Sequence, residues 1–183
     1  PETPGNPDFQ RVKADASCAG RNREHVLKPP LSVRSLAAAG IVAALYIALT
    51  LLFAPVSFGQ IQFRVAEALT LLPVLSPSSV PGLFVGCLLA NLLAGQPWQD
   101  VAFGSLATLA AALLTRRLRA NVWLAALPPV AVNALVIGGL LYFVYGLHPY
   151  ISFLTVFARQ AAVCFLLGVP LVKLLESRGV DVP

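Results

Sequence analysis

Two charged residues, Arg64 and Glu67, lie three positions apart inside an otherwise apolar stretch of this sequence. Residues three apart share one face of a helix, so the two side chains are expected to point the same way. A carboxylate accepts hydrogen bonds and a guanidinium donates them. Together they can recognise the edge of a flat nitrogen heterocycle by complementary hydrogen bonds. The alternative is a self-neutralised ion pair with a structural role only.

Further polar residues are expected near the same end of the helices that carry this pair. The additional candidates for polar contact with a bound molecule are Gln60, Asn91, Asp100, Asn133 and Gln160. Phe58 supplies an aromatic ring that could stack on a planar ligand. Charged side chains within a membrane segment are costly and usually mark a functional interior. Polar groups gathered at one end of a helical bundle therefore predict a cavity open to the outside.

The chemistry indicated is binding rather than catalysis. The chain has no HExxH zinc motif, no GxSxG nucleophile motif and no GxxxxGK[ST] phosphate loop. Its three cysteines, Cys18, Cys87 and Cys164, lack the short spacing of a metal site or a disulfide framework. We therefore expect no enzymatic activity, no cofactor and no metal. Any uphill transport would draw its energy from a partner or from an ion gradient.

The elements that position these residues are those of a membrane protein. The chain has 183 residues, of which 57% are hydrophobic and 11% charged, and its mean hydropathy is +0.78. Soluble domains carry about 25% charged residues. Only 8 charged residues fall within positions 35–175, so this stretch is expected in a bilayer. Soluble enzymes, nucleic-acid-binding domains and disulfide-stapled secreted modules are thereby excluded.

Six segments are apolar enough to be considered as membrane helices. They are residues 33–53, 63–75, 80–94, 100–115, 124–144 and 151–175. The second and third are short for a full span, and they could be tilted or line a water-filled cavity. We predict an all-α membrane protein in which residues 33–176 form a six-transmembrane-helix bundle that binds the substrate.

The positive charges predict the orientation of this bundle. With six helices and a cytoplasmic N-terminus, 11 of the 13 Lys and Arg residues lie on the cytoplasmic side, as the positive-inside rule requires. Both termini are therefore expected inside, with residues 1–32 as a disordered N-terminal tail and residues 177–183 as a short C-terminal tail. The same rule accounts for the net charge of +5 with no nucleic-acid partner.

The first apolar segment carries small residues at four-residue spacing. Ala39 and Ala43 form one stripe, and Gly40 and Ala44 form a second stripe one position further round the helix. Small side chains allow another helix to approach closely within a membrane. These four residues are candidates for a partner interface, and the alternative is close packing within the bundle.

The most specific pattern lies at residues 50–115 and continues towards the C-terminus. It includes IQFRVAEALTLLP at 61–73, PGLFVGCLLANL at 81–92, DVAFGSLATL at 100–109, LPPV at 127–130 and LGVPL at 167–171. These blocks resemble the QueT family of queuosine-precursor transporters. The likeness covers roughly residues 34–175, which is nearly all of the expected membrane part.

The resemblance implies the substrate-binding S component of an energy-coupling-factor transporter in a prokaryotic cell membrane. Its partners would be a transmembrane coupling subunit, which the small residues of the first helix would touch, and two ATP-hydrolysing cassette subunits. Its ligand would be 7-cyano- or 7-aminomethyl-7-deazaguanine. Glu67 would then accept from the guanine-like edge, Arg64 would keep Glu67 ionised or touch the ring carbonyl, and Asp100 would pair with an aminomethyl cation.

Two other functions stay open at this point. One is an S component for a different heterocycle, of the thiamin or riboflavin type, which a ligand panel on the purified protein would separate. The other is a membrane enzyme or scaffold that transports nothing, and its function would not depend on a coupling partner.

Overall fold

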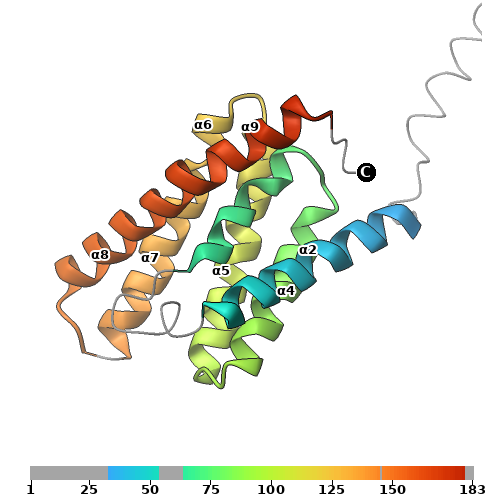
Figure 1. Ribbon diagram of the computed structural model, residues 1–183. Helices are drawn as coiled ribbons and strands as arrows, with labels where there is room; N and C mark the ends of the chain where they lie inside the picture. Colours follow the sequence, from blue (N-terminus) through green and yellow to red (C-terminus); the bar gives the residue numbers. More distant parts are fainter. Residues whose placement is uncertain (1–32, 54–63, 145, 180–183) are drawn as a thin grey trace, which may run out of the picture. The chain divides into compact units, whose positions relative to one another are not determined.

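The computed structural model describes residues 33–53, 64–144 and 146–179, and it is helical throughout these ranges apart from short connections (Figure 1). No β-strand occurs in them. The elements are α2 (Val33–Leu52), η1 (Val65–Val74), α4 (Ser79–Leu93), α5 (Trp98–Arg117), α6 (Val122–Ala125), α7 (Leu127–Phe143), α8 (Pro149–Ala162), η2 (Val163–Gly168) and α9 (Val169–Ser177). Because α6 leads directly into α7, and α8, η2 and α9 are continuous, the described residues form the six helical segments that were expected.

Apolar side chains cover much of the outside of this helical unit. Within the described ranges, three helical runs are long and apolar enough to cross a membrane: Val33–Leu52, Val122–Phe143 and Pro149–Ser177. Leu36 on α2, Leu135 on α7 and Leu154 on α8 are among the large hydrophobic side chains that are exposed. Such a surface is stable against lipid and not against water, so the chain is a membrane protein.

Helices α2 and α4 pack closely because α4 has glycines where α2 crosses it. A Cβ atom at Gly82 would lie 2.5 Å from the carbonyl oxygen of Ala39, and one at Gly86 would lie 3.0 Å from the Cα of Ala43. Ala39 and Ala43 therefore serve packing within the chain, which was the alternative considered for this stripe. Gly40 and Ala44 are exposed on α2, and their role as a partner interface stays a prediction.

The segment around Glu67 is a 3₁₀-helix rather than an α-helix. Its residues from Ala66 to Val74 are all buried, so η1 lies in the interior, between the longer helices (Figure 1). Ten residues rising about 2 Å each reach about 20 Å, which is too short to cross a hydrocarbon core of about 30 Å. Its C-terminal end is held by Arg116 of α5, whose guanidinium donates to the carbonyl oxygens of Pro73 (3.0 Å) and Val74 (3.1 Å).

The last helical run contains one π-helical stretch, η2, directly before Pro170. Proline has no N–H to donate to the preceding turn, and the N–H of Val169 reaches back five residues to the carbonyl oxygen of Cys164. Gly168 lies here against η1, since a Cβ at this position would meet the carbonyl oxygen of Ala68 at 3.2 Å. The run thus packs its irregular turn on the helix that carries Glu67.

Candidate functional site

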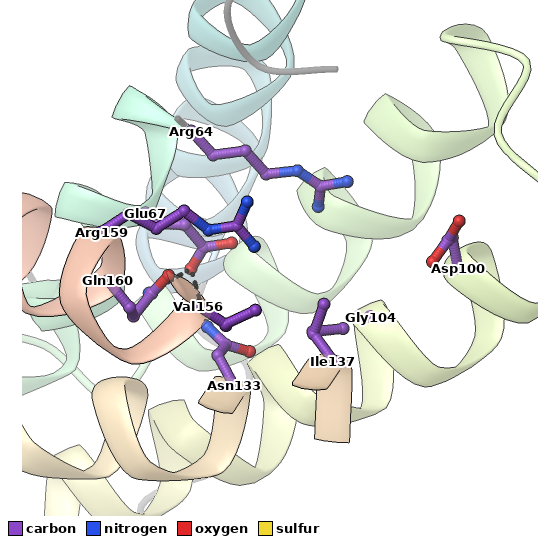
Figure 2. A pocket seen from close by; sticks show the side chains of 9 residues that line it. All are labelled: Arg64, Glu67, Asp100, Gly104, Asn133, Ile137, Val156, Arg159 and Gln160. Atoms are coloured by element: carbon purple, nitrogen blue, oxygen red, sulfur yellow. Dashed lines mark hydrogen bonds between the residues drawn. The ribbon is translucent and has the colours of Figure 1, made fainter. Parts of the chain in front are cut away.

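Four helical segments contribute side chains to one cavity, which has a volume of about 490 Å³ including its open mouth. Figure 2 shows these side chains around the space they enclose. They are Arg64 and Glu67 from the start of η1, Asp100 and Gly104 from α5, Asn133 and Ile137 from α7, and Val156, Arg159 and Gln160 from α8.

Helical spacing explains why these residues meet. On α5, α7 and α8 the lining residues are three or four positions apart, and such residues share one face of an α-helix. On η1 the spacing is three, which is one full turn of a 3₁₀-helix, and the N–H of Glu67 donates to the carbonyl oxygen of Arg64 at 3.1 Å. Each helix therefore turns one face, with at least one polar side chain on it, towards the common space.

The Glu67 carboxylate is buried at the cavity wall, with 4% of the residue exposed. Its Oε1 atom accepts a hydrogen bond of 2.7 Å from the hydroxyl of Tyr46 on α2. Its Oε2 atom accepts from the side-chain amides of Asn133 (3.4 Å) and Gln160 (3.3 Å). A carboxylate has about four acceptor sites, so Glu67 can still accept from a molecule in the cavity.

The cavity holds two positive and two negative side chains. Arg159 places its guanidinium group beside the Glu67 carboxylate, and Arg64 extends its own out over the cavity. Asp100 lies across the cavity, beyond Gly104 and Ile137 (Figure 2). Formal charge is thus balanced, as a poorly solvated site requires. The arrangement offers donors and an acceptor at one side and a second carboxylate at the other.

Most of the residues chosen from the sequence come together in this cavity. Arg64, Glu67, Asp100, Asn133 and Gln160 all line it. Phe58 and Gln60 lie outside the described residues.

Asn91 does not line the cavity. It is fully buried between α4 and α5, with its Nδ2 atom 3.5 Å from the backbone oxygen of Asp100. The same Nδ2 atom would be 3.3 Å from a Cβ at Gly104, so Asn91 lies behind the wall that Gly104 forms. It supports the start of α5 rather than meeting a ligand.

Two polar groups at the site were not among the residues chosen as ligand contacts. Arg159 lines the cavity, and its charge within an apolar segment marks it in the sequence in the same way as Arg64, Glu67 and Asp100. Tyr46 touches Glu67 without lining the cavity, and its only signal was a hydroxyl in the middle of an apolar helix.

The described residues contain no group of three His, Cys, Asp or Glu side chains placed to hold a metal ion. The groups that meet in the cavity are hydrogen-bond donors and acceptors on helices, and they can recognise a polar, planar molecule.

Comparison with known proteins gives one family and one curated relative. The model of the QueT transporter family matches residues 36–177. The queuosine precursor transporter QueT of Lactococcus lactis subsp. cremoris (strain MG1363) is 39% identical over 71 residues, which cover 38% of this chain and 41% of that protein. The match thus spans less than half of the relative's length. No solved structure matches the chain.

Proposed function

The chain belongs to the QueT transporter family, and on this premise we propose that it is the S component that binds a queuosine precursor for uptake by an energy-coupling-factor transporter. The family indicates a membrane transporter for a small molecule rather than an enzyme. The specific ligand class proposed is a 7-deazaguanine with a 7-cyano or 7-aminomethyl group.

The observation that carries this proposal is the buried Glu67 carboxylate at the wall of a cavity. A guanine-like edge presents a ring N–H and an exocyclic amino group side by side, and one carboxylate can accept from both. Arg64 and Arg159 line the same cavity as Glu67 and can donate to the carbonyl oxygen next to that edge. The apolar side chains of Ile137 and Val156 offer surfaces for the faces of the ring.

The proposed orientation has six segments that lead from one side of the membrane to the other, and both termini in the cytoplasm. The short η1 does not have to match the thickness of the hydrocarbon core, because it is buried in the protein interior rather than exposed to lipid. The orientation is supported by the distribution of positive charge, since 11 of the 13 Lys and Arg residues then lie inside. The two exceptions, Arg64 and Arg159, are both among the residues that line the cavity. The cavity then faces the outside of a prokaryotic cell membrane, where a nutrient would enter it.

Asp100 is proposed to distinguish the two ligands. It lies across the cavity from Glu67 (Figure 2), so a ligand bound to Glu67 by its guanine-like edge can direct its 7-substituent towards Asp100. The aminomethyl group is cationic and the cyano group is neutral. We expect Asp100→Asn to weaken equilibrium binding of the aminomethyl ligand about tenfold, or roughly 1.4 kcal/mol, and to leave the cyano ligand within about twofold. An equal effect on both ligands would contradict this assignment.

The exposed small residues of α2 are proposed to meet the transmembrane coupling subunit, which works with two ATP-hydrolysing cassette subunits. Gly40 and Ala44 are exposed on α2, and small residues permit close helix contact in lipid. We expect Ala44→Leu to reduce co-purification with the coupling subunit about tenfold or more, while ligand affinity stays within about twofold.

Ala131 on α7 provides the matched control for this variant, because it is also an exposed alanine on an apolar helix. Ala131→Leu should leave co-purification unchanged. Equal recovery of the complex with Ala44→Leu and with the unaltered chain would remove α2 from the proposed interface.

A further inference from the structure

Tyr46 is a buried polar residue that the proposed binding chemistry does not use. It lies on α2, outside the cavity lining, and 0% of it is exposed. Its hydroxyl donates to Oε1 of Glu67 at 2.7 Å, which joins α2 to η1 through the side chain at the centre of the site. A buried hydroxyl with a single strong acceptor fixes the position of that acceptor.

The two oxygens of Glu67 are held unequally. The bond from Tyr46 to Oε1 is 2.7 Å long, whereas the amides of Asn133 and Gln160 approach Oε2 at 3.4 and 3.3 Å. Hydrogen bonds to a charged acceptor are strongest at about 2.5–2.9 Å and weaken with distance. Of these three hydrogen bonds, the one from Tyr46 is therefore the strongest, and the two amides can be displaced by other donors at lower cost.

The position of Tyr46 is itself set by packing. Its Cβ lies 3.0 Å from where a Cβ at Gly86 would be, so α4 can approach α2 here only because residue 86 is glycine. The ring packs in a core cluster with Val42, Leu83 and Cys87. Interiors of this kind leave little room for a side chain to shift, so the hydroxyl is presented to Glu67 from a fixed point.

We infer that Tyr46 is the positioning residue for ligand recognition: it fixes the Glu67 carboxylate from α2, so that binding in the cavity depends on where α2 lies. The ligand part of this inference rests on the proposed function. Because the outer face of α2 bears Gly40 and Ala44, the same bond connects the ligand site to the helix proposed to meet the coupling subunit.

The first test measures binding of 7-aminomethyl- and 7-cyano-7-deazaguanine to the full chain. We expect Tyr46→Phe to weaken both about tenfold, and to have less than a twofold effect when Glu67 has already been replaced by alanine, which cannot accept the hydrogen bond, because Tyr46 acts through Glu67. Thr50→Val is the matched control, since Thr50 is also a buried hydroxyl on α2 but donates to the backbone oxygen of Tyr46. An unchanged affinity for Tyr46→Phe, or equal losses in both backgrounds, would overturn the inference.

The second test needs no ligand. Dicyclohexylcarbodiimide, a hydrophobic reagent for carboxyl groups in apolar surroundings, is applied to the full chain, and modification of Glu67 is followed by peptide mass spectrometry. Because the Tyr46 hydroxyl holds Oε1 of Glu67 in place, Tyr46→Phe leaves this carboxyl group less restrained and should raise its labelling rate about threefold or more, with Thr50→Val unchanged. Equal labelling of Tyr46→Phe and the unaltered chain would overturn the role of Tyr46. If the unaltered chain binds neither deazaguanine, the proposed substrate fails, while the labelling comparison still decides whether Tyr46 holds Glu67.

Discussion

Replacing Glu67 with glutamine is expected to weaken binding of a 7-deazaguanine about 100-fold, or roughly 2.7 kcal/mol. The change keeps the side chain's volume but removes its charge, and it turns one of two acceptor oxygens into a donor amide. That amide would face the N–H groups of the guanine-like edge. Two charge-assisted hydrogen bonds would then be lost, and the NH₂ group of the glutamine would lie against an N–H group of the ligand, with no acceptor between them. Equilibrium binding of radiolabelled ligand to the purified chain measures the effect.

Glu176 offers the matched control for this substitution. It is an exposed carboxylate in the last turn of α9, away from the cavity lining, and Glu176→Gln should bind ligand as the unaltered chain does. Thermal unfolding without ligand separates a binding defect from a folding defect, because the side-chain oxygen of the introduced glutamine can still accept a hydrogen bond from Tyr46. If Glu67→Gln and Arg64→Ala both bind ligand normally, neither residue belongs to the ligand site.

The location of the site could be predicted because charge is so costly in an apolar environment. Once the apolar segments are recognised, residues such as Arg64, Glu67 and Asp100 need a polar interior, and they share one. The length and composition of the segments likewise predict the helices, including short ones such as Ser79–Leu93. These inferences depend only on the free-energy difference of charged and apolar side chains between water and lipid, and this difference is large.

The direction in which each helix faces could not be predicted in the same way. Helix α2 is apolar on every side, so no hydrophobic stripe distinguishes Ala39, which packs on Gly82, from Gly40, which is exposed. The 3₁₀ geometry of η1 could not be predicted for the same reason. Its residues after Glu67 are nearly all apolar, so the sequence has no periodic polar pattern that would indicate the type of helix. The position of Asn91 along its helix indicated the level of the site in the bundle. That level does not tell whether a side chain lines the cavity or lies behind its wall.

The contact between α2 and α4 leads to the second large effect. We expect Gly82→Ala to destabilise the folded chain by about 1–3 kcal/mol or more, because a Cβ there would lie 2.5 Å from the carbonyl oxygen of Ala39 and 3.1 Å from the Cβ of Val42. The nearest atom belongs to the backbone, which cannot rotate away as a side chain can. Thermal unfolding in mild detergent, or in nanodiscs, measures the loss.

Gly139 on α7 is the matched control, because a Cβ there would meet no atom within 4 Å. Gly139→Ala should be neutral or stabilise the chain by up to about 1 kcal/mol, since alanine favours a helix over glycine. If Gly82→Ala folds, α2 must move away from α4 and carry Tyr46 with it, so ligand affinity should fall together with stability. Equal stability of the two variants would show that α2 does not pack on α4 at this position, and the link from α2 to Glu67 would then lose its support.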